Sequence, residues 1–465
     1  MDTHQPPGER AADRYQWGRS VRERVSLESH AELFGPGSRD PVGLIQGQEA
    51  SRLQSLVPLR HERMGVSAFT FYRGSAIVQA ADLAHTPASG IEVQLSGDAH
   101  LSNFGLYGSP ERRLVFDVND FDETLPGPFE WDVKRLAASF VLAGRDLGHK
   151  EDNNKQAALR AAEAYREVAA RFARARYIDA WYATIDADAL QGLLQEGAKT
   201  KGKKGKKGKK GKAAKRTRKM LDKARSKDCL RALRKLAVEE GGRYRIKSEP
   251  PNIVPLSDLV GDEHPDDTRQ LMGELFRQYE ESLPEDRAAL LRRYRLVDVA
   301  LKVVGVGSVG TRCYVALFEG RDREDPLFLQ IKEALPSVLE AHLQPSRYAH
   351  SGQRVVEGQR LMQSASDIML GWARGTAGAH DYYVRQMWDM KGSADVESFS
   401  PRELRRYATA CGWTLAHAHC RTGSASAISG YLGDDDTFDR AIAEFGVAYA
   451  DLADADYAAF KSAVS

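Results

Sequence analysis

Alternation of apolar and polar residues marks two short strands in the first third of the chain. Ile91, Val93 and Leu95 alternate with polar residues, and residues 114–116 form a second apolar run after a polar loop. A period of two is typical of a strand with one buried face. Acidic residues within 117–122 follow the second run directly. The pattern predicts a strand, a loop and a second strand, and then an acidic segment.

Helical periodicity surrounds these strands. Residues 132–147 and 151–183 place apolar residues three to four positions apart, as a helix with one buried face does. The first ninety residues look helical and irregular, with prolines between the helical stretches. Further helices are predicted over 218–239, 268–293 and 404–420, with a helix pair over 435–463. The chain is therefore predicted to be of the α+β class.

The pattern changes at Leu296, where the sequence becomes β-branched, alternating and rich in glycine. Residues 296–317 predict a strand, a tight glycine loop and a second strand, and a polar turn leads to a third strand that carries Lys332. After a helix, segments 367–372 and 381–386 are again strand-like. We expect these five strands to form one sheet.

Three glycines in this loop fit the pattern G-x-G-x-x-G, which lets backbone N–H groups approach phosphates. Dinucleotide-binding proteins use the same spacing, but there the third glycine opens a helix. Here residues 313–317 continue as a strand, and Lys332 on the next strand can neutralise the α- and β-phosphates. The nucleotide-binding residues predicted in the loop are Gly305, Gly307, Ser308 and Gly310.

The loop between the first two strands holds Asp98 and Asn103, five residues apart, so that one can face a substrate hydroxyl while the other faces a metal. An aspartate at the end of the next strand supplies the hard oxygen ligand that Mg²⁺ prefers. Asp117, Asp120 and Asp122 are all candidates, because spacing does not choose among three neighbouring acids. Phosphoryl transfer needs such a set, since its catalysis is mostly positioning and charge neutralisation.

The string GDAHLSN, followed by DF at 120–121, resembles the catalytic loop and metal motif of aminoglycoside phosphotransferases and choline kinases. These are small-molecule relatives of the protein kinases. Ser96 stands where they usually carry a histidine. The resemblance implies ATP and Mg²⁺ as cofactors. It makes Asp98 the group that orients or deprotonates the acceptor hydroxyl, and makes Asn103 and Asp120 the metal ligands.

A kinase lysine is steadied by a glutamate on a helix. By the same resemblance Glu357 is the preferred partner of Lys332, and Glu340 is the alternative. Met387 begins the segment 387–389, which we expect to be the hinge that meets adenine. Arg73 is a further candidate, able to aim its guanidinium at a phosphate.

Kinases place the glycine loop before the catalytic loop, whereas this chain places it about two hundred residues after. We therefore expect a circularly permuted, two-lobed kinase-like fold, with a helical catalytic lobe and a small antiparallel-sheet nucleotide lobe. The longer strings GDAHLSNFG, FDVNDFDE and GPFEWDVKRLAAS are similar to a bacterial family catalogued as domain of unknown function 2252. The expected parts are an N-terminal region (1–90), a catalytic half (91–295), a nucleotide-binding half (296–390) and C-terminal helices (391–465).

Charge is distributed unevenly along the 465 residues. Residues 199–219 contain 13 Lys and Arg and no acid, so a total net charge of +2 leaves −11 on the remainder. The GKK repeat within this segment cannot bury apolar surface and is predicted to be a disordered insertion. Its stretch Lys201–Lys212 could bind polyanions weakly, as an electrostatic side effect.

The remaining composition points to the cytoplasm. No apolar run reaches the roughly 18 residues that span a bilayer, the N-terminus has no apolar stretch of signal-peptide type, and the four cysteines form no CxxC pair.

We expect an ATP- and Mg²⁺-dependent phosphotransferase acting on a hydroxyl of a small molecule or a protein. Two alternatives are a kinase-fold AMP transferase and an ATP-binding pseudokinase that acts as a switch.

Overall fold

The computed structural model describes residues 10–33, 39–195, 219, 221–226, 229–260, 265–375, 380–387 and 390–464. Except for Lys219, the basic segment 199–219 lies outside these residues, so its predicted disorder stays a prediction. The fold is mixed α+β, and its sheets are antiparallel. Within the described ranges, no helix combines the length and the apolar character needed to cross a bilayer.

The N-terminal region is built of short helices, as predicted. Ser67 caps α4 in a reciprocal capping box with Thr70, and Asp40 accepts from the Gly43 N–H at the start of α2. The helices are α1 (Ala11–Val21), α2 (Pro41–Glu49), α3 (Val57–Met64), α4 (Ala68–Gly74) and α5 (Ala76–Leu83).

Long helices form the largest core. They are α6 (Phe129–Asp146), α7 (Glu151–Ala173), α16 (Pro401–Thr422), α17 (Ala425–Leu432) and α18 (Thr437–Val464). Two predictions were wrong in detail. The helix expected over 151–183 ends at Ala173 and resumes only as the short α8 (Tyr177–Tyr182), and the pair expected over 435–463 is the single helix α18.

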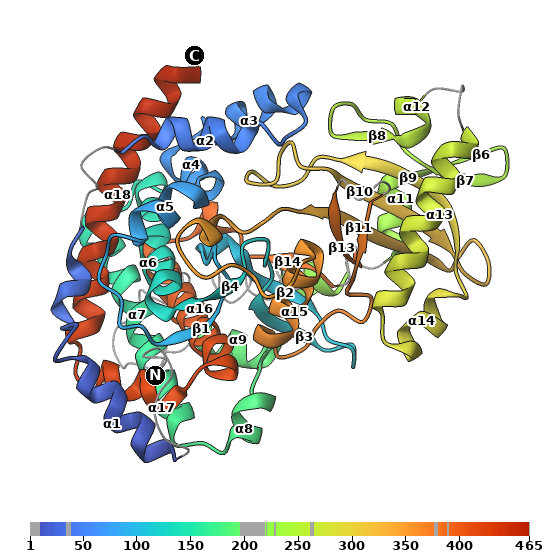
Figure 1. Cartoon of the computed structure of the whole chain (residues 1–465). Helices are drawn as coiled ribbons and strands as arrows, with labels where there is room; N and C mark the ends of the chain where they lie inside the picture. The colour runs from blue at the N-terminus through green and yellow to red at the C-terminus, as the bar shows by residue number, and fades with distance from the viewer. Residues whose placement is uncertain are drawn as a thin grey trace, which may run out of the picture.

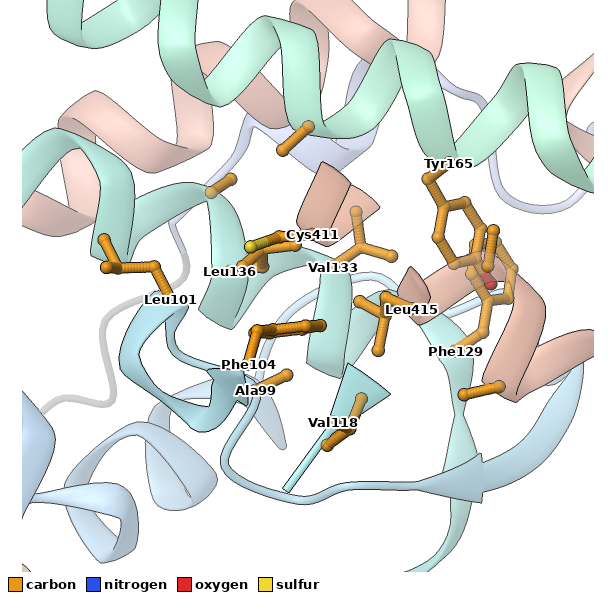
Figure 2. Close-up of a cluster of buried hydrophobic side chains, with 14 of the residues drawn as sticks. Ala99, Leu101, Phe104, Val118, Phe129, Val133, Leu136, Tyr165, Cys411 and Leu415 are labelled. Atoms are coloured by element: carbon orange, nitrogen blue, oxygen red, sulfur yellow. The ribbon is translucent and has the colours of Figure 1, made fainter. Parts of the chain in front are cut away.

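Aromatic side chains pack these helices against one another and against the strands. Phe129 of α6 stacks on Tyr165 of α7, with ring centroids 5.7 Å apart. Phe104 and Val118 of the strands lie buried in the same core (Figure 2). Phe116, on one of the strands, meets Tyr407 of α16 with ring centroids 5.8 Å apart. Because buried aromatic side chains contribute much of the hydrophobic burial of a core, this contact holds the strands against the helices.

The two strands predicted first belong to different sheets. β1 (Glu92–Leu95) pairs with β4 (Leu125–Pro128), whereas β3 (Leu114–Val118) pairs with β2 (Phe104–Gly108). The short strands β14 (Gly392–Ser393) and β5 (Ile185–Asp186) complete the second sheet in the order β14-β2-β3-β5. The loop after β1 and the acidic segment after β3 therefore meet at neighbouring sheet edges.

The five strands predicted after residue 295 form one sheet with an additional edge strand, in the order β12-β13-β11-β10-β9-β8. Its side chains alternate between two clusters on opposite faces: Ala316 packs in one and Leu317 in the other. The strands are β8 (Ile253–Pro255), β9 (Arg295–Lys302), β10 (Cys313–Glu319), β11 (Pro326–Ala334), β12 (Gly371–Arg374) and β13 (Asp381–Gln386).

Segments before residue 295 cover both faces of this sheet. α13 (Pro265–Ser282) and α14 (Glu285–Leu291) pack on one face, and α11 (Cys229–Leu236) packs on the other with the hairpin β6 (Ala237–Glu240) and β7 (Arg243–Ile246). We had expected these segments in the catalytic half. Figure 1 shows the sheet and its helices on one side of the molecule and the long helices on the other.

The remaining helices are short. α15 (Ser351–Met362) contacts β11, β12 and β13 as well as α16 and β1, and so lies between the two parts of the molecule. The others are α9 (Ala187–Gln195) and α12 (Leu256–Val260).

Candidate active site

The loop that follows β1 is held from below by Asp132, in the first turn of α6. The backbone N–H groups of Ser96 and Gly97 donate to its carboxylate at 2.7 and 3.1 Å. His419 of α16 lies 3.1 Å from the same carboxylate through Nε2. Gly97 has φ of +81°, and a Cβ there would lie 2.2 Å from the Glu123 carbonyl oxygen. Only glycine fits this position, so the path of the loop is fixed.

Asp98 stands on this loop at the floor of a cleft. Its Oδ1 accepts from Arg135 Nε at 2.6 Å, while His100 Nε2 lies 3.7 Å from Oδ2. Arg135 is buried and is itself fixed by bonds to Gln79 Oε1 and to the Tyr72 carbonyl oxygen. The Asp98 side chain remains 20% exposed. One carboxylate oxygen is therefore anchored, and the other is left for a ligand in the cleft.

Asn103 and His100 complete the loop. Asn103 Nδ2 donates to the Asp98 carbonyl oxygen at 2.8 Å, which uses the amide nitrogen and leaves Oδ1 as the group that can ligate a cation. Burial lowers the pKa of His100 well below its usual value, and the charges of Arg73 and Arg135 act in the same direction. His100 is therefore neutral at pH 7.

The structure distinguishes the surroundings of Asp117, Asp120 and Asp122, which the sequence alone could not do. Asp117 is 2% exposed and points away from the cleft: its carboxylate accepts from the Val118 N–H at 2.9 Å and from Ser364 N and Oγ at 3.0 and 3.1 Å. Burial raises the pKa of Asp117 to about 6. Its hydrogen bonds tie the end of β3 to Ser364, two residues after the end of α15, so Asp117 has a structural role.

Asp120 and Asp122 both face Lys332 of β11. Lys332 Nζ forms an ion pair with Asp122 Oδ2 and lies 3.9 Å from Asp120 Oδ1. Tyr383 donates its hydroxyl to Asp122 Oδ1 at 2.8 Å, and Ser308 Oγ lies 3.5 Å from Asp122 Oδ2. Asp120 Oδ1 is buried and has no hydrogen-bond partner in the described part of the chain. The 3.9 Å separation places Lys332 well within the length of a triphosphate of Asp120.

Electrostatics distinguishes these two carboxylates. Burial and the charge of Asp122 raise the pKa of Asp120. Burial would also raise the pKa of Asp122, but the charge and hydrogen bond of Lys332 outweigh it and lower that pKa. Burial opposes the charge on Lys332, yet Asp120 and Asp122 hold its pKa well above the usual value. Lys332 and Arg385 oppose the rise in the pKa of Asp120. Asp122 is thus the hydrogen-bonded counter-ion of the lysine, whereas Asp120 Oδ1 faces the lysine without a hydrogen bond.

Neither glutamate expected beside Lys332 is there. Glu357 pairs with Arg360 one turn along α15, at 2.9 Å, and Glu340 Oε1 accepts from the Ser337 N–H in a capping box. The side chain that α15 contributes instead is Arg354, as the next contacts show. Both glutamate predictions were therefore wrong. Asp122, in the acidic segment after β3, already supplies the counter-charge of Lys332.

Arg354 ties α15 to the acidic segment through backbone atoms. Its guanidinium donates to the carbonyl oxygens of Asp122, Thr124 and Leu335 at 2.7, 2.7 and 2.8 Å. Burial lowers the pKa of Arg354, and the charge of the adjacent Glu123 opposes that shift. Burial in turn raises the pKa of Glu123 to about 7, against the opposing charge of Arg354.

The glycine loop between β9 and β10 lines the same cleft as Asp98. Gly305 and Gly310 have φ of +63° and +89°, which other residues adopt only with strain. Arg52 donates to the Val309 carbonyl oxygen at 2.5 Å, and the Leu53 N–H donates to the Gly310 carbonyl oxygen at 2.8 Å. Arg52 and Leu53 of the N-terminal region therefore hold this loop in place.

The cleft has a volume of about 570 Å³, within the range of small-molecule sites. Met387 does not line it but packs in the hydrophobic cluster around Leu317 and Phe328, and residues 388–389 lie outside the described ranges. The adenine contact predicted for Met387 is therefore not present. The predicted residues that do line the cleft are Asp98, Asn103, Asp120, Gly305, Gly307 and Ser308. Lys332 lies beneath them, and Gly310 lies against Arg52.

Several residues of the site were not predicted from the sequence. Tyr383 and Arg354 reach it across large sequence separations, for which no local pattern exists. Arg135 could have been predicted from the sequence. It lies three residues after Asp132, and therefore on the same face of a helix that begins beside the loop.

Residues 52–463 match the model of a family described as an uncharacterized protein conserved in bacteria (DUF2252). No curated protein matches the chain, and no solved structure does.

Proposed function

The chain belongs to the DUF2252 family, and we propose that it is an ATP- and Mg²⁺-dependent phosphotransferase acting on a hydroxyl group. One observation carries the proposal: a glycine loop, a lysine on a strand and a loop with an anchored aspartate converge on one cleft from segments about 210 residues apart. We also propose that the fold is a circularly permuted, kinase-like arrangement and that the protein is located in the cytoplasm.

Magnesium fits the residues at the floor of the cleft. Oδ1 of Asp120 is a buried hard oxygen without a hydrogen-bond partner among the described residues, and Asn103 offers an amide oxygen. Among the described residues, no cluster of three or more His, Cys, Asp and Glu side chains has metal-binding geometry. Mg²⁺ commonly binds through one or two carboxylates together with substrate phosphates and water, so two protein ligands suffice. When bound, Mg²⁺ would neutralise phosphate charge.

The roles of the protein's own groups follow from their positions. Asp98 would accept the proton of the acceptor hydroxyl at Oδ2, because Arg135 already occupies Oδ1. Lys332 would bind phosphate oxygens, and the backbone N–H groups of Gly305–Gly310 would cover the phosphates. Asp122 would hold Lys332 charged and in place.

The first test uses ATP labelled separately at the γ and α positions, incubated with Mg²⁺, the protein and a bacterial extract. We expect acceptors labelled from the γ position. Label from the α position would indicate AMP transfer, the alternative that reverses the nucleotide in the cleft. Asp98→Asn should abolish labelling and retain ATP binding, since it keeps the shape of the side chain and removes the base.

A matched control is available on α15. Glu357→Gln should leave both labelling and ATP binding unchanged, because Glu357 pairs only with Arg360 among the contacts of the described residues. ATP with Mg²⁺ at 100 times Kd should stabilise the fold by roughly 2.7 kcal/mol. Absence of both stabilisation and labelling would refute the proposal.

A further inference from the structure

Arg73, at the end of α4, is a cleft-lining arginine without a partner. Its guanidinium forms no ion pair and no hydrogen bond with any described residue, and its Nε is buried. Its guanidinium carbon lies 5.8 Å from the centroid of the Phe69 ring. A buried cationic group without a hydrogen-bond acceptor is costly, so such a group usually waits for a ligand.

The surroundings of Arg73 place it near Asp98. Arg135 donates both to Asp98 Oδ1 and to the carbonyl oxygen of Tyr72, the residue before Arg73. A Cβ added at Gly307 would lie 3.2 Å from the Arg73 carbonyl oxygen, so Arg73 also adjoins the glycine loop. Burial lowers the pKa of Arg73, and the charges of Asp98, Glu397 and Asp120 oppose that shift. Arg73 therefore lies close to the group that would face the acceptor hydroxyl and to the loop that would cover the nucleotide phosphates.

Arg52 offers a useful contrast, because it lines the same cleft but both of its terminal nitrogens have partners. Its Nη1 donates to the Val309 carbonyl oxygen at 2.5 Å and its Nη2 donates to Gln48 Oε1 at 3.2 Å. Arg52 thus fixes the glycine loop. Of the two arginines that line the cleft, only Arg73 has both terminal nitrogens without a partner in the described part of the chain.

The wall next to Arg73 leaves room for an acceptor. One face of α2 lines the cleft with Gly43, Leu44, Gly47 and Gln48. A Cβ added at Gly47 would meet no atom within 4 Å. A small polar molecule can therefore lie between α2 and Asp98.

We propose that the phosphoryl acceptor carries an anionic group, a phosphate or a carboxylate, and that Arg73 binds this group beside Asp98. The inference rests on the proposed phosphotransferase function and names the substrate class of that same site. Arg73 would orient the acceptor so that its hydroxyl faces Asp98 Oδ2, because an anion held by a guanidinium has a defined direction.

The first experiment measures binding of inorganic phosphate by calorimetry, with the protein saturated by Mg²⁺ and a non-hydrolysable ATP analogue. The nucleotide then fills its own phosphate subsites. Arg73→Gln should weaken phosphate binding roughly tenfold to hundredfold, as expected for hydrogen bonds to a charged group. Arg73→Lys should keep part of the affinity. Arg440→Gln removes a charge on the exposed surface of α18 and should change nothing.

Equal phosphate affinity in the wild type and Arg73→Gln, or no phosphate binding by the wild type, would overturn the inference. Failure to bind the ATP analogue is a separate result that counts against the phosphotransferase proposal. In that case the phosphate titration without nucleotide still decides whether Arg73 is an anion site.

The second experiment separates a bacterial metabolite extract on an anion exchanger and offers each fraction to the protein with γ-labelled ATP. We expect the labelled acceptor in the retained, anionic fraction, with a higher KM in Arg73→Gln than in Arg440→Gln. Labelling confined to the neutral fraction would overturn the inference. Labelling of neither fraction would count against the phosphotransferase proposal on which it rests.

Discussion

The ion pair between Lys332 and Asp122 makes a strong prediction about stability. The Lys332 side chain is 3% exposed and the Asp122 side chain 30% exposed, so the pair is largely shielded from water. Lys332→Met keeps the aliphatic volume but leaves Asp120 and Asp122 as neighbouring carboxylates without this cation. Removing one partner of a buried pair costs about 3–5 kcal/mol. We expect about 3 kcal/mol, because water can still reach part of Asp122.

The double substitution Lys332→Met with Asp122→Asn should recover part of this loss, with a coupling energy of about 1–3 kcal/mol. The loss should also shrink as pH falls from 7 towards 4. In Lys332→Met the lowering charge of Lys332 is lost, so burial should raise the folded-state pKa of both carboxylates above the unfolded value of about 3.9. Their cost is then expected above that pH and should disappear as they protonate.

Equilibrium urea unfolding followed by tryptophan fluorescence measures these differences. Trp372 of β12 lies opposite Tyr383 in the register and reports on this part of the sheet. A loss under about 1 kcal/mol at pH 7, together with no coupling between the two substitutions, would show that the sheet and the acidic segment do not meet as described.

Four other predictions concern the surroundings of the site. Asp132→Asn should abolish phosphoryl transfer but retain ATP binding, since it weakens the charge that holds the loop N–H groups; equal turnover in the variant would contradict this. The folded-state pKa of Glu123, about 7, exceeds its unfolded value of about 4.3, so this carboxyl costs stability as pH rises between these values. Glu123→Gln should therefore flatten the dependence of the melting temperature on pH across that range. Gly47→Leu should raise stability by up to about 1 kcal/mol through helix propensity, yet raise the KM for the acceptor by filling the cleft; an unchanged KM would show that the acceptor binds elsewhere. Deletion of Lys201–Lys212 should lower the affinity for polyanions, measured by gel shift at low salt, and leave ATP binding unchanged.

The sheet was predictable because its signals are local. Alternation over 296–317, the glycine loop and the polar turn before Lys332 each follow from neighbouring residues, and the structure confirms the five strands. The edge strand β8 was missed because three residues, Ile253–Pro255, carry too little alternation to be recognised.

The side-chain partners within the site were less predictable, because they depend on contacts between residues far apart in the sequence. The three acids after β3 look equivalent in sequence, and only their partners distinguish them: Ser364 holds Asp117 and Lys332 holds Asp122. The prediction of a glutamate partner for Lys332 was wrong for the same reason. Chain order alone also suggested that residues 229–291 belong with the helices, whereas their apolar faces fit the sheet.

The order of the segments has a consequence for biosynthesis. The acidic segment leaves the ribosome about 210 residues before Lys332, which at 5–20 residues per second corresponds to roughly 10–40 s. During that interval Asp120 and Asp122 lack their cation, and Asp132 lacks His419, which comes still later. The first half of the nascent chain therefore cannot settle into its final cleft. The candidate active site becomes complete only when α16 has been made. If the proposed function is right, shortened chains should be inert rather than weakly active.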